Sequence, residues 1–183
     1  MPEKSTRRLD ARSLRALAHP LRMRILAALK SDGPATSTTL ANRLGESTGT
    51  LSWHLRHLAE HGFIEEDAER GTKRERWWRV THARHLLDPG DMSEEPAAMT
   101  VYMGEIIRQC FERTNRYISE DWSAEWQSAA TLSDWQDLRL TPERLEELNR
   151  ELLALVDRYA DAPQDLDGQP VSVQIQSFPR RAV

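Results

Sequence analysis

The chain has 183 residues, of which 39% are hydrophobic, and a net charge of −4, so it can fold as one large domain or two small ones. Residues 1–85 carry 16 Lys and Arg against 10 Asp and Glu, whereas residues 86–183 carry 9 against 19, which favours a polyanion-binding module joined to one that binds no polyanion. The single cysteine, Cys110, excludes an intramolecular disulfide, and the lack of a signal-peptide core or a run of about 18 apolar residues predicts a cytoplasmic protein without membrane contact.

The first part of the sequence predicts short helices separated by turn residues. Residues 10–18 space apolar side chains along one helical face, and this helix must end before Pro20, because proline is not tolerated in a helix interior. A second helix begins at this proline. A third, shorter helix has Thr36 or Ser37 as its N-cap and ends at Gly45.

The next segment, residues 47–61, predicts a helix with two different sides. Ser47 is a favourable N-cap, and Gly62 ends the helix. Leucines recur at spacings of four and three residues, which places them on one buried stripe. This stripe consists of Leu51, Leu55 and Leu58.

A β-hairpin is predicted directly after this helix, over residues 63–80. Two short strands flank a charged tip at Gly71. Trp77 and Trp78 alternate across the second strand, so one should be in the core and the other partly exposed. Two short helices joined by a small turn and followed by a basic hairpin form a winged helix-turn-helix.

At this point the sequence resembles the ArsR-type winged-helix transcription regulators of bacteria. The resemblance covers Leu14 to Thr81 and is carried by "ALAHPLRMRILAAL", "TLANRLGESTGTLSWHLRHLAEHGFIEE" and "RWWRVT". Its most specific element is Ser52-x-His54-Leu55-x-x-Leu58 followed by Gly62. The resemblance implies a DNA-binding regulator that acts as a homodimer assembled by helices flanking the winged helix.

Residues 88–96, "DPGDMSEEP", are rich in turn formers and acid and predict a linker. The chain would then consist of a winged helix-turn-helix domain at 1–87 and a dimerisation or effector module at 97–183. In this second module we expect a long helix over 97–120, a strand within 128–140, a helix capped by Thr141 and a strand over 171–178. The predicted fold class is mostly α with small β, the second module being α+β.

The outward side of the helix at 47–61 is predicted to enter the major groove of double-stranded DNA, and the hairpin at 63–80 to contact the backbone. An arginine can donate to both acceptors of a guanine, and hydroxyl groups can bond bases or phosphates. The candidate residues on the helix are Thr48, Gly49, Ser52, Trp53, Arg56 and, at its flank against phosphate, His54 and His57. Those on the hairpin are Arg70, Lys73, Arg74 and Arg76.

Two alternatives to DNA binding use the same segment. Spacings of three and four residues place His54, His57 and His61 on one flank, so a metal-sensing repressor that binds zinc is conceivable. The chain has no cysteine pair and no histidine in its terminal helices, so we expect no metal or other cofactor. The second alternative is a winged helix that docks a protein partner.

Three tryptophans of the second module, Trp122, Trp126 and Trp135, define a candidate pocket for a small-molecule effector. Aromatic residues more often fill a core or a subunit interface, and we favour that interpretation. The sequence has no glycine-rich phosphate loop, paired-carboxylate signature or nucleophilic serine elbow, so we expect no enzyme.

Overall fold

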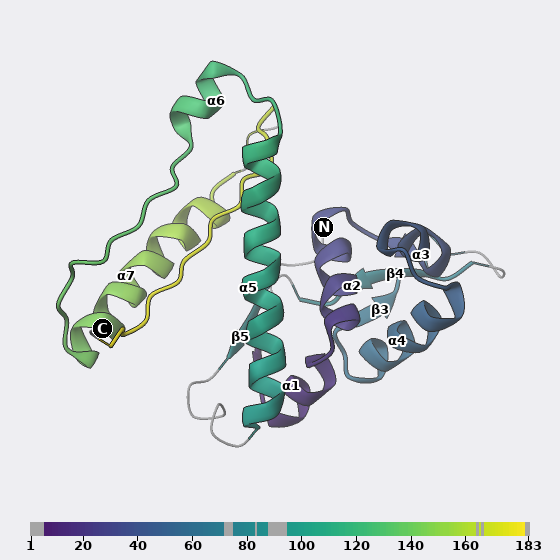
Figure 1. The fold of residues 1–183 in the computed structure, drawn as a ribbon. Helices are drawn as coiled ribbons and strands as arrows, with labels where there is room; N and C mark the ends of the chain where they lie inside the picture. Colours follow the sequence, from purple (N-terminus) through teal and green to yellow (C-terminus); the bar gives the residue numbers. More distant parts are fainter. Residues whose placement is uncertain are drawn as a thin grey trace. The chain divides into compact units, whose positions relative to one another are not determined.

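The computed structural model describes residues 6–71, 75–82, 84–87, 95–163, 165 and 167–181 (Figure 1). The chain divides into two compact units, Met1–Gln109 and Cys110–Val183. The division therefore falls inside a helix, later than the expected linker at 88–96, most of which lies outside the described residues. Among the described helices, none combines the length and the apolar character needed to cross a membrane.

The first unit contains the predicted helices and hairpin. Its described elements are β1 (Thr6–Leu9), α1 (Ala11–Leu17), α2 (Pro20–Ser31), β2 (Ala35–Thr36), α3 (Ser37–Leu44), α4 (Thr48–Glu60), β3 (Ile64–Glu66), β4 (Trp77–Val80), β5 (Arg84–Leu87) and the first part of α5 (Pro96–Ser119). The predicted caps are confirmed, since the hydroxyls of Thr36 and Ser47 accept hydrogen bonds from backbone N–H groups three residues later, each at 3.1 Å. Gly45 ends α3 in the left-handed conformation, with φ of 70°.

The strands form two small sheets. The predicted hairpin, β3 with β4, is confirmed and gains β2 as a third strand in the order β2-β4-β3, all antiparallel. Trp78 is buried and Trp77 partly exposed, as their alternation predicts. A second sheet pairs β1 with β5 in parallel, with Leu9 opposite Leu87. Neither β1, β2 nor β5 was predicted, because each is too short to show a period.

The core of the first unit lies between α1, α2, α3, α4 and the three-stranded sheet. Leu51, Leu55 and Leu58 are fully buried, so the predicted stripe of α4 faces this core. Met99 and Tyr102, on the first turns of α5, are also buried in it. These contacts explain why the unit extends past the expected linker to Gln109.

The second unit is formed by the rest of α5, by α6 (Ala124–Ala129) and by α7 (Pro142–Asp161), joined by extended irregular segments. The helix capped by Thr141 is confirmed as α7. The strands expected within 128–140 and over 171–178 are absent, because nothing in the described part of the unit supplies them with a hydrogen-bonding neighbour. No described residue from Cys110 to Arg181 is buried.

Candidate nucleic-acid interface

The side of α4 opposite its leucine stripe is a polar surface. Trp53 is 53% exposed, and Thr48, Gly49 and Arg56 are exposed beside the partly buried Ser52. The Nε of Arg56 donates to the carbonyl oxygen of Ser52 at 3.3 Å, so the guanidinium is held against its own helix. These five residues therefore lie on the side of α4 that the sequence pattern assigned to them.

A shallow groove joins this surface to the hairpin. It is lined by Ser37, Ser52, Arg56, Arg76 and Trp78, which come from α3, α4 and the hairpin. Two arginines and two hydroxyl groups thus converge around one hollow, a combination suited to an anionic, hydrogen-bonding partner. Ser37 and Trp78 were not predicted as site residues, since only the packing of α3 and the hairpin against α4 brings them there.

The described arginines of the hairpin are paired with its own carboxylates. Nε of Arg70 lies 3.6 Å from Asp67, Nε of Arg76 lies 3.8 Å from Glu66, and Arg79 contacts Glu65 at 2.8 Å. These arginine side chains are 43–68% exposed, so their pairs are held in high-dielectric surroundings and are readily exchanged. Lys73 and Arg74 lie outside the described residues.

The prediction that His54 lies at the exposed flank of α4 is wrong. Its side chain is only 5% exposed, and its ring packs against His19, with ring centroids 4.6 Å apart. The position follows from helix geometry, because residue 54 is three residues after one stripe leucine and four before another. Burial, helped by the nearby charges of His19, Arg22 and His57, lowers the pKa of His54 to about 4. This histidine is therefore neutral at neutral pH and does not reach a phosphate.

His57 and His61 remain closer to the surface. The ring of His57 stacks on Trp53 at 5.6 Å and lies 4.4 Å from the ring of His61. The carbonyl oxygen of His61 accepts a hydrogen bond from Arg7 at 2.7 Å, which ties the end of α4 to β1. In the part of the chain that the structure describes, no group of three His, Cys, Asp or Glu side chains is arranged to hold a metal ion.

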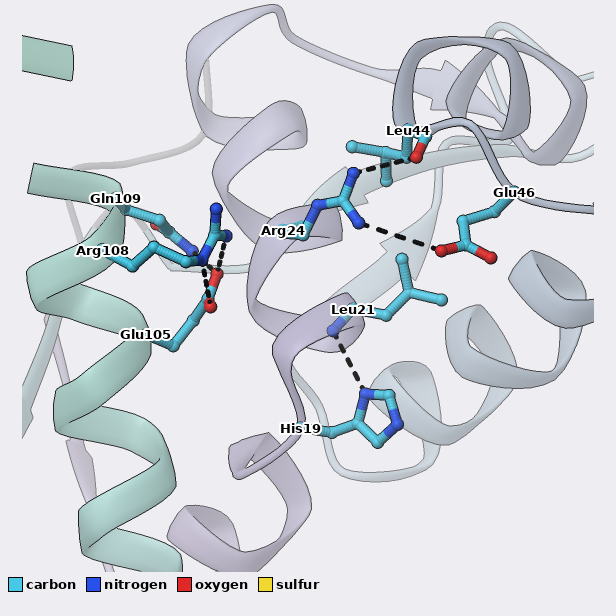
Figure 2. A network of polar contacts seen from close by, with 8 residues as sticks. All are labelled: His19, Leu21, Arg24, Leu44, Glu46, Glu105, Arg108 and Gln109. Atoms are coloured by element: carbon cyan, nitrogen blue, oxygen red, sulfur yellow. Dashed lines mark hydrogen bonds and ion pairs between the residues drawn. The ribbon is translucent and has the colours of Figure 1, made fainter. Parts of the chain in front are cut away.

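A polar network fixes the turn between α3 and α4 (Figure 2). Arg24 on α2 donates to the carbonyl oxygen of Leu44 at 2.8 Å and lies 3.8 Å from the carboxylate of Glu46. His19 caps the start of the same helix by accepting from the N–H of Leu21 at 3.1 Å. One guanidinium therefore holds both the last carbonyl of α3 and the side chain of Glu46, which lies on the segment that leads into α4.

On α5, Figure 2 shows Glu105 on the side of the helix that faces α2. Its side chain is 4% exposed and accepts hydrogen bonds from Arg108 Nε and Gln109 Nε2, each at 2.8 Å. Burial raises the pKa of Glu105, but these hydrogen bonds and the charges of Arg108 and Arg24 outweigh it, so the pKa lies below its ordinary value. The buried carboxylate is thus charged and satisfied.

The replacement Arg24→Ala should lower the free energy of unfolding by about 1–2 kcal/mol, because the Leu44 carbonyl loses a charged donor and Glu46 loses its partner. Urea unfolding followed by tryptophan fluorescence measures this change. Arg43→Ala is the matched control, since the exposed pair of Arg43 with Asp32 at 3.1 Å should contribute less than about 1 kcal/mol. Equal losses in both variants would contradict a special role for Arg24.

The three tryptophans of the candidate effector pocket lie in the second unit. Trp122 is partly buried and its ring is 6.0 Å from that of Tyr117. Trp126 is 38% and Trp135 72% exposed. Trp126 and Trp135 are thus open to solvent in this unit, and the effector pocket stays a prediction.

Comparison with known proteins finds a family model that matches part of the first unit. Residues 17–67 match the family model described as "Helix-turn-helix domain". No curated protein matches the chain. The chain is similar to reduced HlyU from Vibrio cholerae, with 28% identity over 37% of this chain and 66% of that protein and a TM-score of 0.33. It thus spans just under two thirds of that protein's length.

Two further solved structures are similar to the chain. One is a possible transcriptional regulator for arsenical resistance, 29% identical over 51% of this chain and 84% of that chain, with a TM-score of 0.34. The other is the homodimeric winged helix-turn-helix DNA-binding domain of a possible ArsR-family regulator from Mycobacterium bovis, 20% identical over 54% and 79%, with a TM-score of 0.35.

The matched segment contains α2, the tethered turn between α3 and α4, and β3. The exposed side of α4 and the groove beside it belong to this segment and to the hairpin that completes it. Residues 17–67 therefore match a helix-turn-helix family model, and with the hairpin of β3 and β4 the first unit has the arrangement of a winged helix-turn-helix.

Proposed function

We propose that this chain is a sequence-specific DNA-binding transcription regulator that acts as a homodimer. The observation that carries the proposal is the groove in which Ser52 and Arg56 of α4 meet Arg76 of the hairpin, on the side of α4 that the core leaves open. A helix with one buried side and one cationic, hydroxyl-bearing side fits the major groove, which is wide enough to admit an α-helix.

In this proposal α4 is the recognition helix. Arg56 leaves the carbonyl of Ser52 and donates to the O6 and N7 of a guanine, while Ser52 and Thr48 bond a base or a phosphate. Trp53 is exposed enough to pack against a sugar or a thymine methyl group. The first N–H groups of α4, near Gly49, suit a phosphate.

The hairpin supplies the contacts to the DNA backbone. Arg70 and Arg76, with Lys73 and Arg74, would each replace a carboxylate or water by a phosphate. Because Arg70 and Arg76 already face Asp67 and Glu66, the net gain from each is smaller than for an unpaired cation. The excess of positive charge in residues 1–85 supports the same polyanionic partner.

The homodimer is supported by an apolar stripe on α5. Its side chains recur at helical spacing and remain exposed, which is unusual for large apolar residues at spacings of four and seven. They are Met103, Ile107, Phe111 and Ile118, with exposures of 38%, 54%, 68% and 64%. Two copies joined through this helix would present two recognition helices, and the half-sites in DNA should lie about 10–10.5 base pairs apart, or a multiple of this.

Arg56→Ala tests the recognition surface. A target sequence is first selected from a random pool of duplexes with the wild-type protein, and fluorescence anisotropy then gives the dissociation constant at fixed salt. We expect binding to weaken by about 1–3 kcal/mol, with unfolding unchanged, because Arg56 is exposed and supports no core contact.

Arg150→Ala, which removes an exposed arginine from α7, is the matched control and should leave DNA affinity unchanged. A folded Arg56→Ala protein that binds the selected duplex as tightly as the wild type would remove α4 as the recognition helix.

A further inference from the structure

The last described part of the second unit, residues 169–181, is an extended segment. In the described part of the chain, no backbone–backbone hydrogen bond reaches residues 169–181. The segment is nevertheless fixed to its own unit through side chains, since Gln174 donates to the carbonyl of Cys110 at 3.3 Å and Ser177 to Asn149 on α7. Figure 1 shows it, in yellow, running along α7. An extended backbone with open N–H and C=O groups is a template to which another strand can add.

The side chains of this segment have the pattern of a half-buried strand. Val171, Val173 and Ile175 alternate with polar neighbours, yet they are 70%, 60% and 37% exposed. The unit around them buries none of its described residues. A surface of this kind is incomplete in one copy of the chain, because apolar residues on a strand are stabilised only when another layer or strand covers them.

The charge distribution permits a second copy of the chain as the neighbour of this segment. From Gly168 to Phe178 the sequence has no charged residue, whereas residues 86–183 as a whole hold 19 acidic against 9 basic residues. Two copies that meet through the charged surfaces of this acidic region would place like charges together. At the uncharged segment they can meet without repulsion.

The segment is also complementary to itself. In an antiparallel pair centred on Val173, this residue lies opposite the partner's Val173, and Val171 lies opposite the partner's Ile175. Directly opposite residues in an antiparallel pair share one face, so all six apolar side chains would gather on the same side of the ribbon.

We propose that residues 171–175 of two copies pair as antiparallel strands centred on Val173, forming a two-stranded ribbon in the dimer interface. This inference rests on the homodimer of the proposed function. It accounts for a segment with a strand pattern that forms no strand in a single chain, because the hydrogen-bonding partner belongs to the second copy.

Cysteine cross-linking on the full chain tests the pairing and its register. In a Cys110→Ser background, Val173→Cys should form an intermolecular disulfide under mild oxidation, since directly opposite Cα atoms lie about 4.5–5.5 Å apart. Val171→Cys is the matched control and should not, because two copies of residue 171 would be four residues apart along the ribbon, about 13 Å. The double variant Val171→Cys with Ile175→Cys should cross-link again.

A second measurement does not depend on oxidation. Val173→Lys places two ammonium groups opposite each other at the centre of the ribbon, and light scattering should show the dissociation constant of the dimer raised by about tenfold or more. A wild-type dimer that is unaffected by Val173→Lys and gives no Val173→Cys cross-link would overturn the ribbon while leaving the homodimer in place. A wild-type monomer at micromolar concentration would overturn both. Equal cross-linking at positions 171 and 173 would also overturn the ribbon, because it reports random encounters of an unpaired segment.

Discussion

Lowering the pH from 7 to 4.5 should reduce the free energy of unfolding by about 2 kcal/mol through His54 alone. Burial is the largest cause that lowers the pKa of His54 to about 4, from an ordinary value of 6.5. Between these two values the unfolded chain binds a proton that the folded chain does not. Stability is therefore fully present above about pH 6.5 and is lost as the pH falls toward 4.

The replacement His54→Gln isolates this contribution. Urea unfolding of both proteins at pH 7 and pH 4.5 gives the difference in stability at each pH, and this difference should shrink by about 2 kcal/mol at the lower pH. His85, whose pKa burial lowers to about 3, titrates in both proteins and cancels in the comparison. A difference that is the same at both pH values would show that His54 is not held neutral by the fold.

The winged helix could be predicted from the sequence because its signals are local. Pro20, the caps Thr36 and Ser47, and the leucine stripe of α4 each act within a few residues, and each is found where it was expected. The pairing of β1 with β5 could not be predicted, since Thr6 and Arg84 are separated in the sequence by most of the first unit. A four-residue strand has no periodicity that identifies such a distant partner.

The candidate site shows the same limit at the level of single residues. Arg56 and Trp53 were assigned correctly to the exposed side of α4, because helical spacing fixes the face on which they lie. His54 was misplaced because its residue type suggested a polar surface, whereas its position lies on the leucine stripe. Ser37 and Trp78 enter the groove only through tertiary packing.

In the second unit the sequence predicted strands that its described residues do not form. The alternation of Val171, Val173 and Ile175 describes a strand correctly as a pattern, but a strand exists only when a neighbouring backbone accepts and donates its hydrogen bonds. Helix α7, whose hydrogen bonds are internal, was predicted with its N-cap Thr141 from the same kind of local evidence. Local patterns are therefore sufficient for a long, capped helix such as α7 and insufficient for strands whose partner lies elsewhere.

Leu55→Ala should lower the free energy of unfolding by about 2–5 kcal/mol, because Leu55 is fully buried and its loss leaves a cavity between α4 and the core. Trp53→Ala, two residues earlier on the same helix, is the matched control. Trp53 is 53% exposed, so its replacement should change stability by less than about 1 kcal/mol. Urea unfolding of the two variants, with DNA binding measured under native conditions, separates the two sides of α4. Leu55→Ala should show the large loss in the free energy of unfolding, whereas Trp53→Ala should remain folded and bind the selected duplex more weakly. If Trp53→Ala proved the more destabilising of the two, the side of α4 that we assign to DNA would instead be structural.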